Sequence, residues 1–415
     1  MKTQFNLTYV IFSLLFLSSC DWGGSGDEPL MPNLRALKAP EQEMVQSSSR
    51  FAMDLFHQLQ EKDDPNQFYS PYSIHQALSM TMNGNEGEVL EEFIQVLRYE
   101  GMGVTQANEA AKSLTEFLLE LDPKVRLSIA NAIWHKQEWE VNPDFEETVS
   151  NSFGAEVAGL DMGNPQSVDV INNWIEQNTE GLIKDMLDAI PPNAAMYLVN
   201  AIYFKADWKY RFDEKLTKKA PFTTSGGAEV QVDMMQLAEP TTLKFHSESG
   251  LDYLEIPYST GQYSLGILTA DEGLQKKLEG LDLEVLEQYR EDAREKDLLL
   301  HMPKFKMRYK MEDMKEDLIN MGLTLPFQNH PGNFTRLFAN TTAPLKISRV
   351  IHEALIEVDE KGSEAAAATI VEIRETSLPS YSAYKLNKPF VFFIQEKHSG
   401  AILFMGKLGD PSLLD

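Results

Sequence analysis

Side chains that could carry chemistry are abundant in this sequence, but none of them falls into a catalytic or metal-binding pattern. The eight histidines lie at no metal-ligand spacing from one another, and Cys20 is the only cysteine. The motifs HExxH, GxSxG, GxxxxGKS/T and GxGxxG are all absent. A single cysteine also excludes an intrachain disulfide and a CxxC site. We therefore expect no cofactor and no metal.

Composition and charge indicate an acidic globular protein. The chain has 415 residues, of which 43% are hydrophobic and 24% charged, and its formal net charge is −26. Loss of residues 1–19 would remove one positive charge, that of Lys2, and would change −26 to −27. Nucleic acids and polyanions such as heparin bind clustered lysine and arginine, so we expect neither as a partner. We expect a monomer.

The most unusual segment is VDEKGSEAAAATIVEIRETS, residues 358–377. Every second residue from Ser363 to Ile373 is uncharged, and these residues change from small at the start to β-branched at the end. The charged residues of this window all belong to the alternate set. Such alternation is typical of a half-buried β-strand.

The same segment also has features of a mobile chain. Four consecutive alanines at positions 365–368 favour a helix or coil when no strand pairs with them. No proline interrupts the chain between Gly362 and Thr376, and Gly362 lies where a hinge needs free backbone torsions. The pattern therefore indicates a segment that is exposed in one state and a central strand in another. An alanine-rich solvated helix or linker is the alternative, because a helical period fits the charges as well.

The N-terminus has the pattern of a targeting segment. A short apolar run at residues 9–17 follows Lys2 and ends in LSSC, which resembles the lipobox of bacterial lipoproteins. This resemblance implies a signal peptide at residues 1–19, lipidation of Cys20 and a flexible tether at residues 20–42. We accordingly expect an exported lipoprotein in the periplasm or at the cell surface, which touches the membrane only through its lipid anchor. The alternative is an ordinary secretory cleavage site and a secreted protein.

The remaining chain, residues 43–415, shows no linker or internal repeat and is predicted to be one domain. Helices are expected around the stripe of Phe51, Leu55, Phe56 and Leu59, and at residues 73–82, 105–121 and 165–177. Strands are expected at residues 194–205, 298–307, 354–358, 390–394 and 402–408. Helices and strands do not alternate regularly, so the predicted fold class is α+β.

Several blocks of the sequence match one known family. They are NQFYSPYSIHQALSM, LSIANAIWH, INNWIEQNTEGLIKDML, LVNAIYFKADW, ISRVIHEALIEV and NKPFVFFIQEKHSGAILFMGKL. Together with VDEKGSEAAAAT, they resemble the serpin superfamily, inhibitory type, from about Phe51 to Pro411. The resemblance implies three β-sheets, about nine helices and an exposed reactive-centre loop at residues 360–388.

The resemblance also implies a function, which is inhibition of serine proteases and not an enzyme activity. A protease would attack the loop and form an acyl-enzyme. The upstream limb of the loop would then insert into the main sheet and trap the protease. The alternative is a non-inhibitory member that acts in binding or as a chaperone.

Counted from Glu360, the usual family length places cleavage between Thr376 and Ser377. Threonine in that position suits elastase-like or subtilisin-like proteases, whereas cleavage after Arg374 by a trypsin-like enzyme is the competing interpretation. The resemblance assigns the loop hinge to Glu360, Gly362, Ser363, Ala365, Ala366, Ala367 and Ala368. It assigns the shutter, a polar cluster under the main sheet, to Ser70, Ser73, Asn200 and His352, and the breach, where the loop enters, to Trp208.

Overall fold

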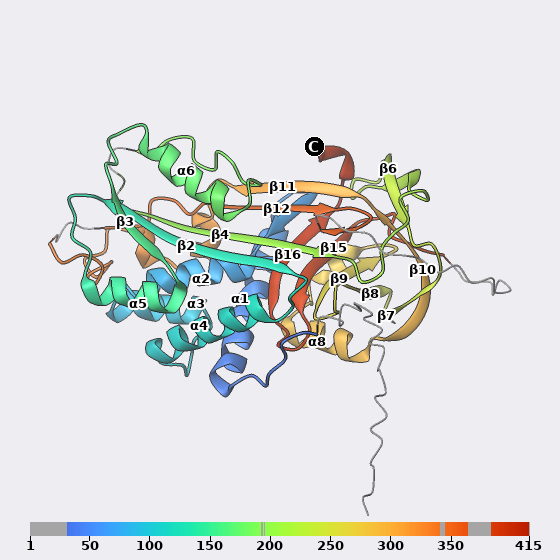
Figure 1. Cartoon of the computed structure of the whole chain (residues 1–415), viewed down its shortest axis with the longest axis horizontal. Coiled ribbons are helices and arrows are strands. Elements are labelled where there is room, and N and C mark those ends of the chain that lie inside the picture. Colours follow the sequence, from blue (N-terminus) through green and yellow to red (C-terminus); the bar gives the residue numbers. More distant parts are fainter. Residues whose placement is uncertain (1–30, 192–193, 195, 341–344, 364–382, 415) are drawn as a thin grey trace, which may run out of the picture. The chain divides into compact units, whose positions relative to one another are not determined.

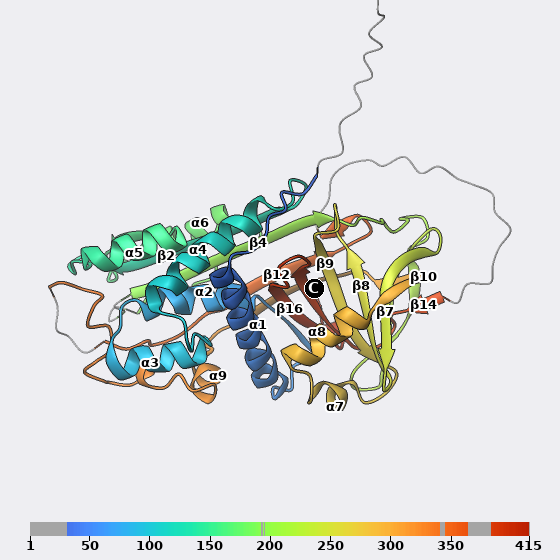
Figure 2. The same cartoon turned by 90° about the horizontal axis from the view of Figure 1, so that it is seen from below.

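The computed structural model describes residues 31–191, 194, 196–340, 345–363 and 383–414. Nine α-helices form among them. Their bounds are α1 (Ala39–Gln60), α2 (Pro71–Met82), α3 (Gly87–Val96), α4 (Val104–Glu120), α5 (Pro143–Phe153), α6 (Ser167–Asn178), α7 (Leu274–Leu278), α8 (Leu283–Asp292) and α9 (Lys315–Asn320). Helices α2 to α6 gather on one side of the folded domain, and α7 and α8 lie against strands on the other side (Figure 2).

The strands of the described residues form three hydrogen-bonded sheets. The largest has the order β1 (Asn66–Tyr69), β16 (Ile402–Leu408), β15 (Phe390–Glu396), β9 (Tyr263–Ala270), β8 (Leu251–Pro257), β7 (Thr241–Glu248), β10 (Arg294–Pro303), β6 (Glu229–Gln236) and β5 (Lys218–Thr223). Strand β14 (Ala383–Lys385) pairs in parallel with β10. The expected α+β class with three sheets is confirmed.

The two smaller sheets lie next to each other (Figure 1). One has the order β13 (Gly362–Ser363), β4 (Met196–Asp207), β2 (Arg126–Lys136) and β3 (Glu156–Leu160), and the other pairs β11 (Phe305–Met311) with β12 (His352–Val358). Among the described residues no ladder joins β4 to β12. We call the space between these two strands the slot.

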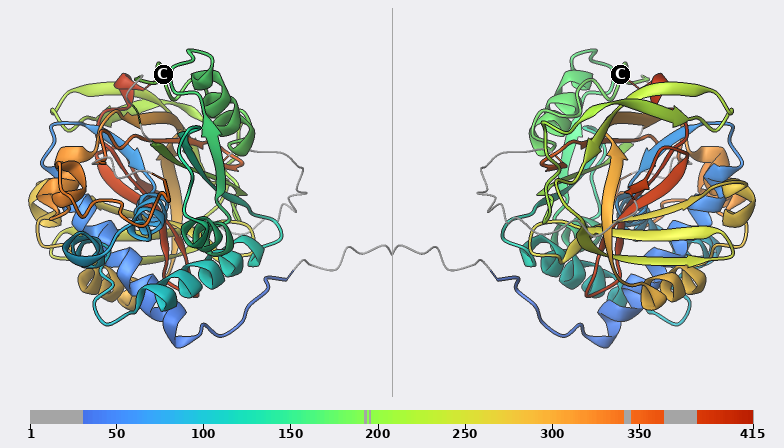
Figure 3. Two further views of the ribbon diagram at one scale, coloured as in Figure 1. Left: turned by 90° about the vertical axis from the view of Figure 1, so that its left-hand side faces the viewer. Right: turned by 90° about the vertical axis from the view of Figure 1, so that its right-hand side faces the viewer.

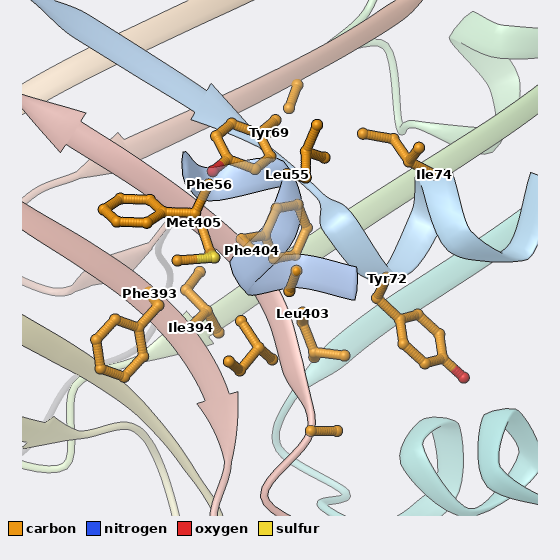
Figure 4. Packing of buried hydrophobic residues seen from close by; sticks show 14 of the residues in the cluster. Leu55, Phe56, Tyr69, Tyr72, Ile74, Phe393, Ile394, Leu403, Phe404 and Met405 are labelled. Atoms are coloured by element: carbon orange, nitrogen blue, oxygen red, sulfur yellow. The ribbon is translucent and has the colours of Figure 1, made fainter. Parts of the chain in front are cut away.

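The main core lies between α1, α2 and the large sheet. All seven residues of β15 are buried, as expected for a central strand covered on both faces. Leu55 and Phe56 of α1 and Phe404 and Met405 of β16 all belong to this core (Figure 4). A second, smaller core joins α6 to the outer face of β2 and β4 (Figures 1 and 3).

Most of the elements predicted from the sequence are present, with bounds that differ by a few residues. Two predictions were wrong in detail. The single strand expected at residues 298–307 is two strands, β10 and β11, which Lys304 separates. The tether expected at residues 20–42 extends too far, because α1 begins at Ala39 and Glu41 is only 1% exposed.

Candidate functional site

The loop hinge enters the slot beside Asp207, at the C-terminal end of β4. We call this the upper end of the slot, and the opposite end, beside Met196, the lower end. Gly362 and Ser363 pair in antiparallel register with Asp207 and Ala206 of β4. The Ser363 hydroxyl lies 3.0 Å from the Tyr258 hydroxyl, and both side chains are buried. Strand β13 is therefore the start of an additional strand beside β4, and it contacts β12 as well.

Gly362 is required by close packing. A Cβ atom at this position would lie 2.1 Å from the carbonyl oxygen of Ala206 and 2.6 Å from the Cα of Asp207. Both distances are far below van der Waals contact. A need for free backbone torsions, predicted from the sequence, does not explain this glycine, because Gly362 is not among the residues with positive φ. The physical reason is the approach of the β4 backbone.

Trp208 holds the turn that precedes the hinge. Its indole Nε1 donates to the carbonyl oxygen of Asp359 at 2.8 Å, and its backbone N–H donates to the carbonyl oxygen of Lys361 at 2.7 Å. The indole stacks on the Tyr258 ring with centroids 4.3 Å apart. The predicted breach residue thus contacts the hinge directly, through its own bonds and through the ring that touches Ser363.

Glu360 anchors the end of β12 to two other segments. Its carboxylate accepts hydrogen bonds from Lys304 Nζ at 2.9 Å and from the Thr217 hydroxyl at 2.8 Å. Burial alone would raise the pKa of this carboxyl, but the bonds from Lys304 and Thr217 outweigh burial and lower the pKa. Glu360 is therefore charged at neutral pH while only 7% exposed.

The four predicted shutter residues lie together at the lower half of the slot. His352 Nε2 accepts from the backbone N–H of Ser70 at 3.0 Å, and Ser70 Oγ accepts from the backbone N–H of Ser73, which caps α2. The Ser73 hydroxyl donates to the Asn200 side chain, which in turn donates to Asn131 Oδ1 at 2.6 Å. This network connects β12, α2, β4 and β2, so it reaches both walls of the slot.

His352 is held in its neutral form. Burial lowers the pKa of its imidazole to about 3, because the charged form has no compensating solvation there. A neutral ring is needed for the observed bond, since Nε2 acts as an acceptor.

The slot contains very different amounts of free space along its length. A cavity of about 290 Å³ lies at the lower half, where its walls include residues 196–200 of β4 and residues 345–352 before and at the start of β12. Directly beside Ser363 the free volume is only about 20 Å³. Entry of a further strand would therefore meet its first obstacle just below the hinge.

Other predicted site residues lie outside the described residues. They are Cys20, Ala365, Ala366, Ala367, Ala368, Arg374, Thr376 and Ser377. Within the described ranges, no group of three or more histidine, cysteine, aspartate or glutamate side chains could hold a metal ion. No helix of those ranges is long and apolar enough to cross a membrane.

Several residues that complete the site were not predicted from the sequence. They are Asn131, Thr217, Tyr258 and Lys304. Asn131 lies directly opposite Asn200 in the β2–β4 ladder, and Lys304 lies 56 positions before its partner Glu360. No local pattern marks such residues, because each acts through a partner that only the folded chain brings near.

Comparisons with known proteins agree with this geometry. The sequence profile of the serpin (serine protease inhibitor) family matches residues 46–411. Human Serpin B4 is 31% identical over 392 residues, which cover 89% of this chain and 99% of Serpin B4.

Solved structures give the same result. Human thyroxine-binding globulin superimposes with a TM-score of 0.82 at 25% identity and covers 90% of this chain and 100% of its own. The native state of the thermophilic serpin tengpin gives 0.81 at 27% identity, with 92% and 97% covered. The profile, the sequence relative and the two folds together show that this chain belongs to the serpin family, whose members are generally protease inhibitors and not enzymes.

Proposed function

We propose that this protein inhibits serine proteases as a suicide substrate, by inserting its cleaved loop into the slot. The observation that carries the proposal is the register of β13. Gly362 pairs with Asp207 of β4, and the two strands are antiparallel. If that register continues, residue 373, eleven positions after Gly362, would lie opposite Met196, eleven positions before Asp207. Residues 362–373 would then match β4 over its whole length, Met196–Asp207.

The same register also predicts which side chains of the inserted strand would face the core. Ser363 lies opposite Ala206, so every second residue from Ser363 to Ile373 would point to the inner face that carries Asn200. This is the uncharged set of the sequence. The charged set would point to the outer face, on the side of α6. A charge-free face directed into the core is what a central strand needs.

The chemistry of the proposed reaction occurs at the bond between Thr376 and Ser377. The protease serine attacks the Thr376 carbonyl, the peptide bond breaks, and the amine of Ser377 leaves with a proton from the protease. The protease is then esterified to Thr376. Fourteen residues, from Ser363 to Thr376, extend about 45 Å as a strand, so insertion would carry the acyl-enzyme along the sheet before water can release it.

The test is a panel of elastase-like, subtilisin-like and trypsin-like proteases incubated with the protein. We expect a complex that survives SDS with at least one of them, and the mass of the released C-terminal peptide then distinguishes cleavage after Thr376 from cleavage after Arg374.

Ala367→Pro should abolish the complex, because proline would remove a ladder N–H in the inserting strand. Ser380→Pro, beyond the cleavage point, is the matched control and should leave the complex intact. Loop cleavage without any complex across the panel would contradict the proposal.

A binding function without inhibition is the second candidate. The likeness to thyroxine-binding globulin, solved with bound thyroxine, favours it. Such a protein need not insert its loop, so its melting temperature should stay unchanged after cleavage within residues 364–382. An inhibitory protein should show a rise of many degrees, because the inserted strand completes the sheet. The uncharged face of residues 363–373 supports the inhibitory proposal.

We further propose export and anchoring through Cys20. A bacterial host fed labelled palmitate should label the full chain but not Cys20→Ala, and both should fold equally. Label in both, or in neither, would contradict the anchor.

A further inference from the structure

The connection between α6 and β4 crosses the outer side of the slot. We call residues 179–190 the strap. Its apolar side chains Ile183 and Leu187 belong to the small core on the outer face of β2 and β4. Asn172 of α6 binds the strap twice, donating to the Leu187 carbonyl at 2.8 Å and accepting from the Leu187 N–H at 2.9 Å. The strap is therefore fastened to the β4 wall of the slot.

The side chain of Arg308 hydrogen-bonds the strap to the opposite wall. Arg308 of β11 donates from Nη2 to the carbonyl oxygen of Lys184 at 2.7 Å. The same guanidinium donates from Nε to the carboxylate of Glu353 on β12. One planar fork thus joins β11, β12 and the strap, which is a geometry that arginine can provide and lysine cannot.

The strap closes the slot where the next loop residues would enter. Leu182 of the strap, Phe204 of β4 and Leu355 of β12 share the space of about 20 Å³ beside Ser363. In the extended register, residues 365 and 366 would lie opposite Phe204 and its neighbour. Leu182 is the strap side chain at this small space, so we expect it to move outward when they enter, and the bond from Arg308 to Lys184 resists that motion.

Glu353 holds Arg308 in place, because its buried carboxylate is paired with the Arg308 guanidinium. The Glu353 side chain has no exposed surface, and its Oε2 has no hydrogen-bond partner among the described residues. Lys310 lies opposite Glu353 in the ladder but pairs with Glu312 instead. Arg308 is therefore the partner that compensates this buried charge, so it cannot easily leave.

We propose that Arg308 is a positioning residue that latches the strap over the slot and limits the rate at which a strand enters. This inference rests on the proposed function, because it assumes that the slot accepts a strand. The latch would set how fast the cleaved loop inserts, and thereby the balance between trapping a protease and releasing it.

The test uses a synthetic peptide with the sequence of residues 363–376, which requires no knowledge of the target protease. The full chain is incubated with the peptide, and uptake is followed over time by native mass spectrometry. Arg308→Lys keeps a charge for Glu353 but has one nitrogen in place of the two that bind Glu353 and Lys184, so we expect the bond to Lys184 to be lost. We expect it to take up the peptide roughly five to ten times faster than the wild type, since one charge-assisted hydrogen bond is lost.

Lys306→Met is the matched control. Lys306 lies on the same face of β11 and pairs with Glu357 at 3.2 Å, and no bond from it to the strap is present. It should leave the rate unchanged. If Arg308→Lys proves unstable, the double variant Arg308→Met with Glu353→Met removes both charges together and should also accelerate uptake, because neither charge is left unpaired.

The outcomes separate the two proposals. Uptake by every variant at the wild-type rate overturns the latch alone, as does equal acceleration by Lys306→Met. Failure of every variant to take up the peptide, together with no rise in melting temperature after loop cleavage, overturns the proposed function and the latch with it. Faster uptake by Arg308→Lys alone supports both.

Discussion

Two residues at the slot matter for different physical reasons, Gly362 for close packing and His352 for burial. There is no room for a Cβ at Gly362 beside the β4 backbone, and the buried His352 accepts a backbone hydrogen bond. A Cβ at position 362 would displace the backbone, and replacement of His352 would remove the acceptor of the Ser70 N–H. Both effects can be measured separately from inhibition.

Gly362→Ala should displace β13 from β4. The added methyl would meet the Ala206 carbonyl oxygen at 2.1 Å, so the hinge must move and its two ladder pairs are lost. We expect a loss of about 1–3 kcal/mol in the free energy of unfolding, measured by urea titration. We also expect a smaller rise in melting temperature after loop cleavage. Gly226→Ala is the control, because its nearest neighbour would be Thr224 Oγ1 at 3.8 Å. Equal behaviour of the two variants would exclude the close-packing explanation.

His352 should make stability depend on pH. Its pKa in the folded protein is about 3, below its usual 6.5, so below pH 6.5 the unfolded chain binds a proton that the folded chain does not. The contribution of His352 is therefore complete above pH 6.5 and decreases as the pH falls toward 3. Between pH 7 and pH 5 the loss should be about 2 kcal/mol. His352→Asn should remove this part of the dependence in urea titrations at the two pH values, and parallel curves for the two proteins would contradict it.

At the scale of secondary-structure elements, β12 is held at both ends by polar contacts. Glu360, which follows its upper end, binds Lys304, which lies between β10 and β11, and His352 at its lower end binds the start of α2. The strand is thus fixed although its inner edge lacks a ladder to β4. These end contacts fix the position of β12, which forms one wall of the slot.

Glu360 and Lys304 should be energetically coupled. A double-mutant cycle with Glu360→Gln and Lys304→Met should give a coupling of about 1–2 kcal/mol in the free energy of unfolding, because the Glu360 carboxylate is buried while Lys304 is half exposed. The neighbouring pair of Lys306 on β11 and Glu357 on β12 is more exposed and should give a coupling of about 0.5 kcal/mol or less. The pKa of Glu360 is lowered in the folded protein, so its coupling should be complete above the usual pKa of a glutamate carboxyl. The coupling should be lost as the pH falls through the lowered pKa. Equal coupling for both pairs would refute the role of burial.

At the scale of the whole domain, the N-terminal residues contribute to the folded unit. Arg35 pairs with the buried carboxylate of Glu41 at 2.7 Å and lies over the ring of Phe117 of α4. The hydrogen bond from Arg35 lowers the pKa of Glu41 to about 2. A domain boundary at residue 42 would place both residues in the tether, although Glu41 is buried and Arg35 lies over Phe117.

Truncation should reveal the true boundary. A chain that begins at Met31 should unfold at the same urea concentration as the full chain. A chain that begins at Ala39 should lose about 3 kcal/mol, because Glu41 would be left buried without Arg35. Arg35→Met in the chain from Met31 should reproduce most of this loss, which separates the ion pair from the other contacts of residues 31–38. Equal stability of all these chains would show that the pair contributes nothing.

The sequence by itself determined the fold class, the helices and strands of its most periodic segments, and the two-faced pattern of residues 363–373. These features depend on local period and composition, which a strand or helix displays regardless of its neighbours. The predicted shutter residues also lie together, since the family blocks that contain them keep their order along the chain.

Only the tertiary structure decided where the slot is and what closes it. Strands β4 and β12 each have the sequence of a buried strand, and nothing in either sequence shows that they do not pair with each other. The contacts of Arg308 with Lys184 and of Asn131 with Asn200 join residues 124 and 69 positions apart. Their proximity follows from sheet register and from the path of the strap, and long-range geometry of this kind leaves no periodic trace in the chain.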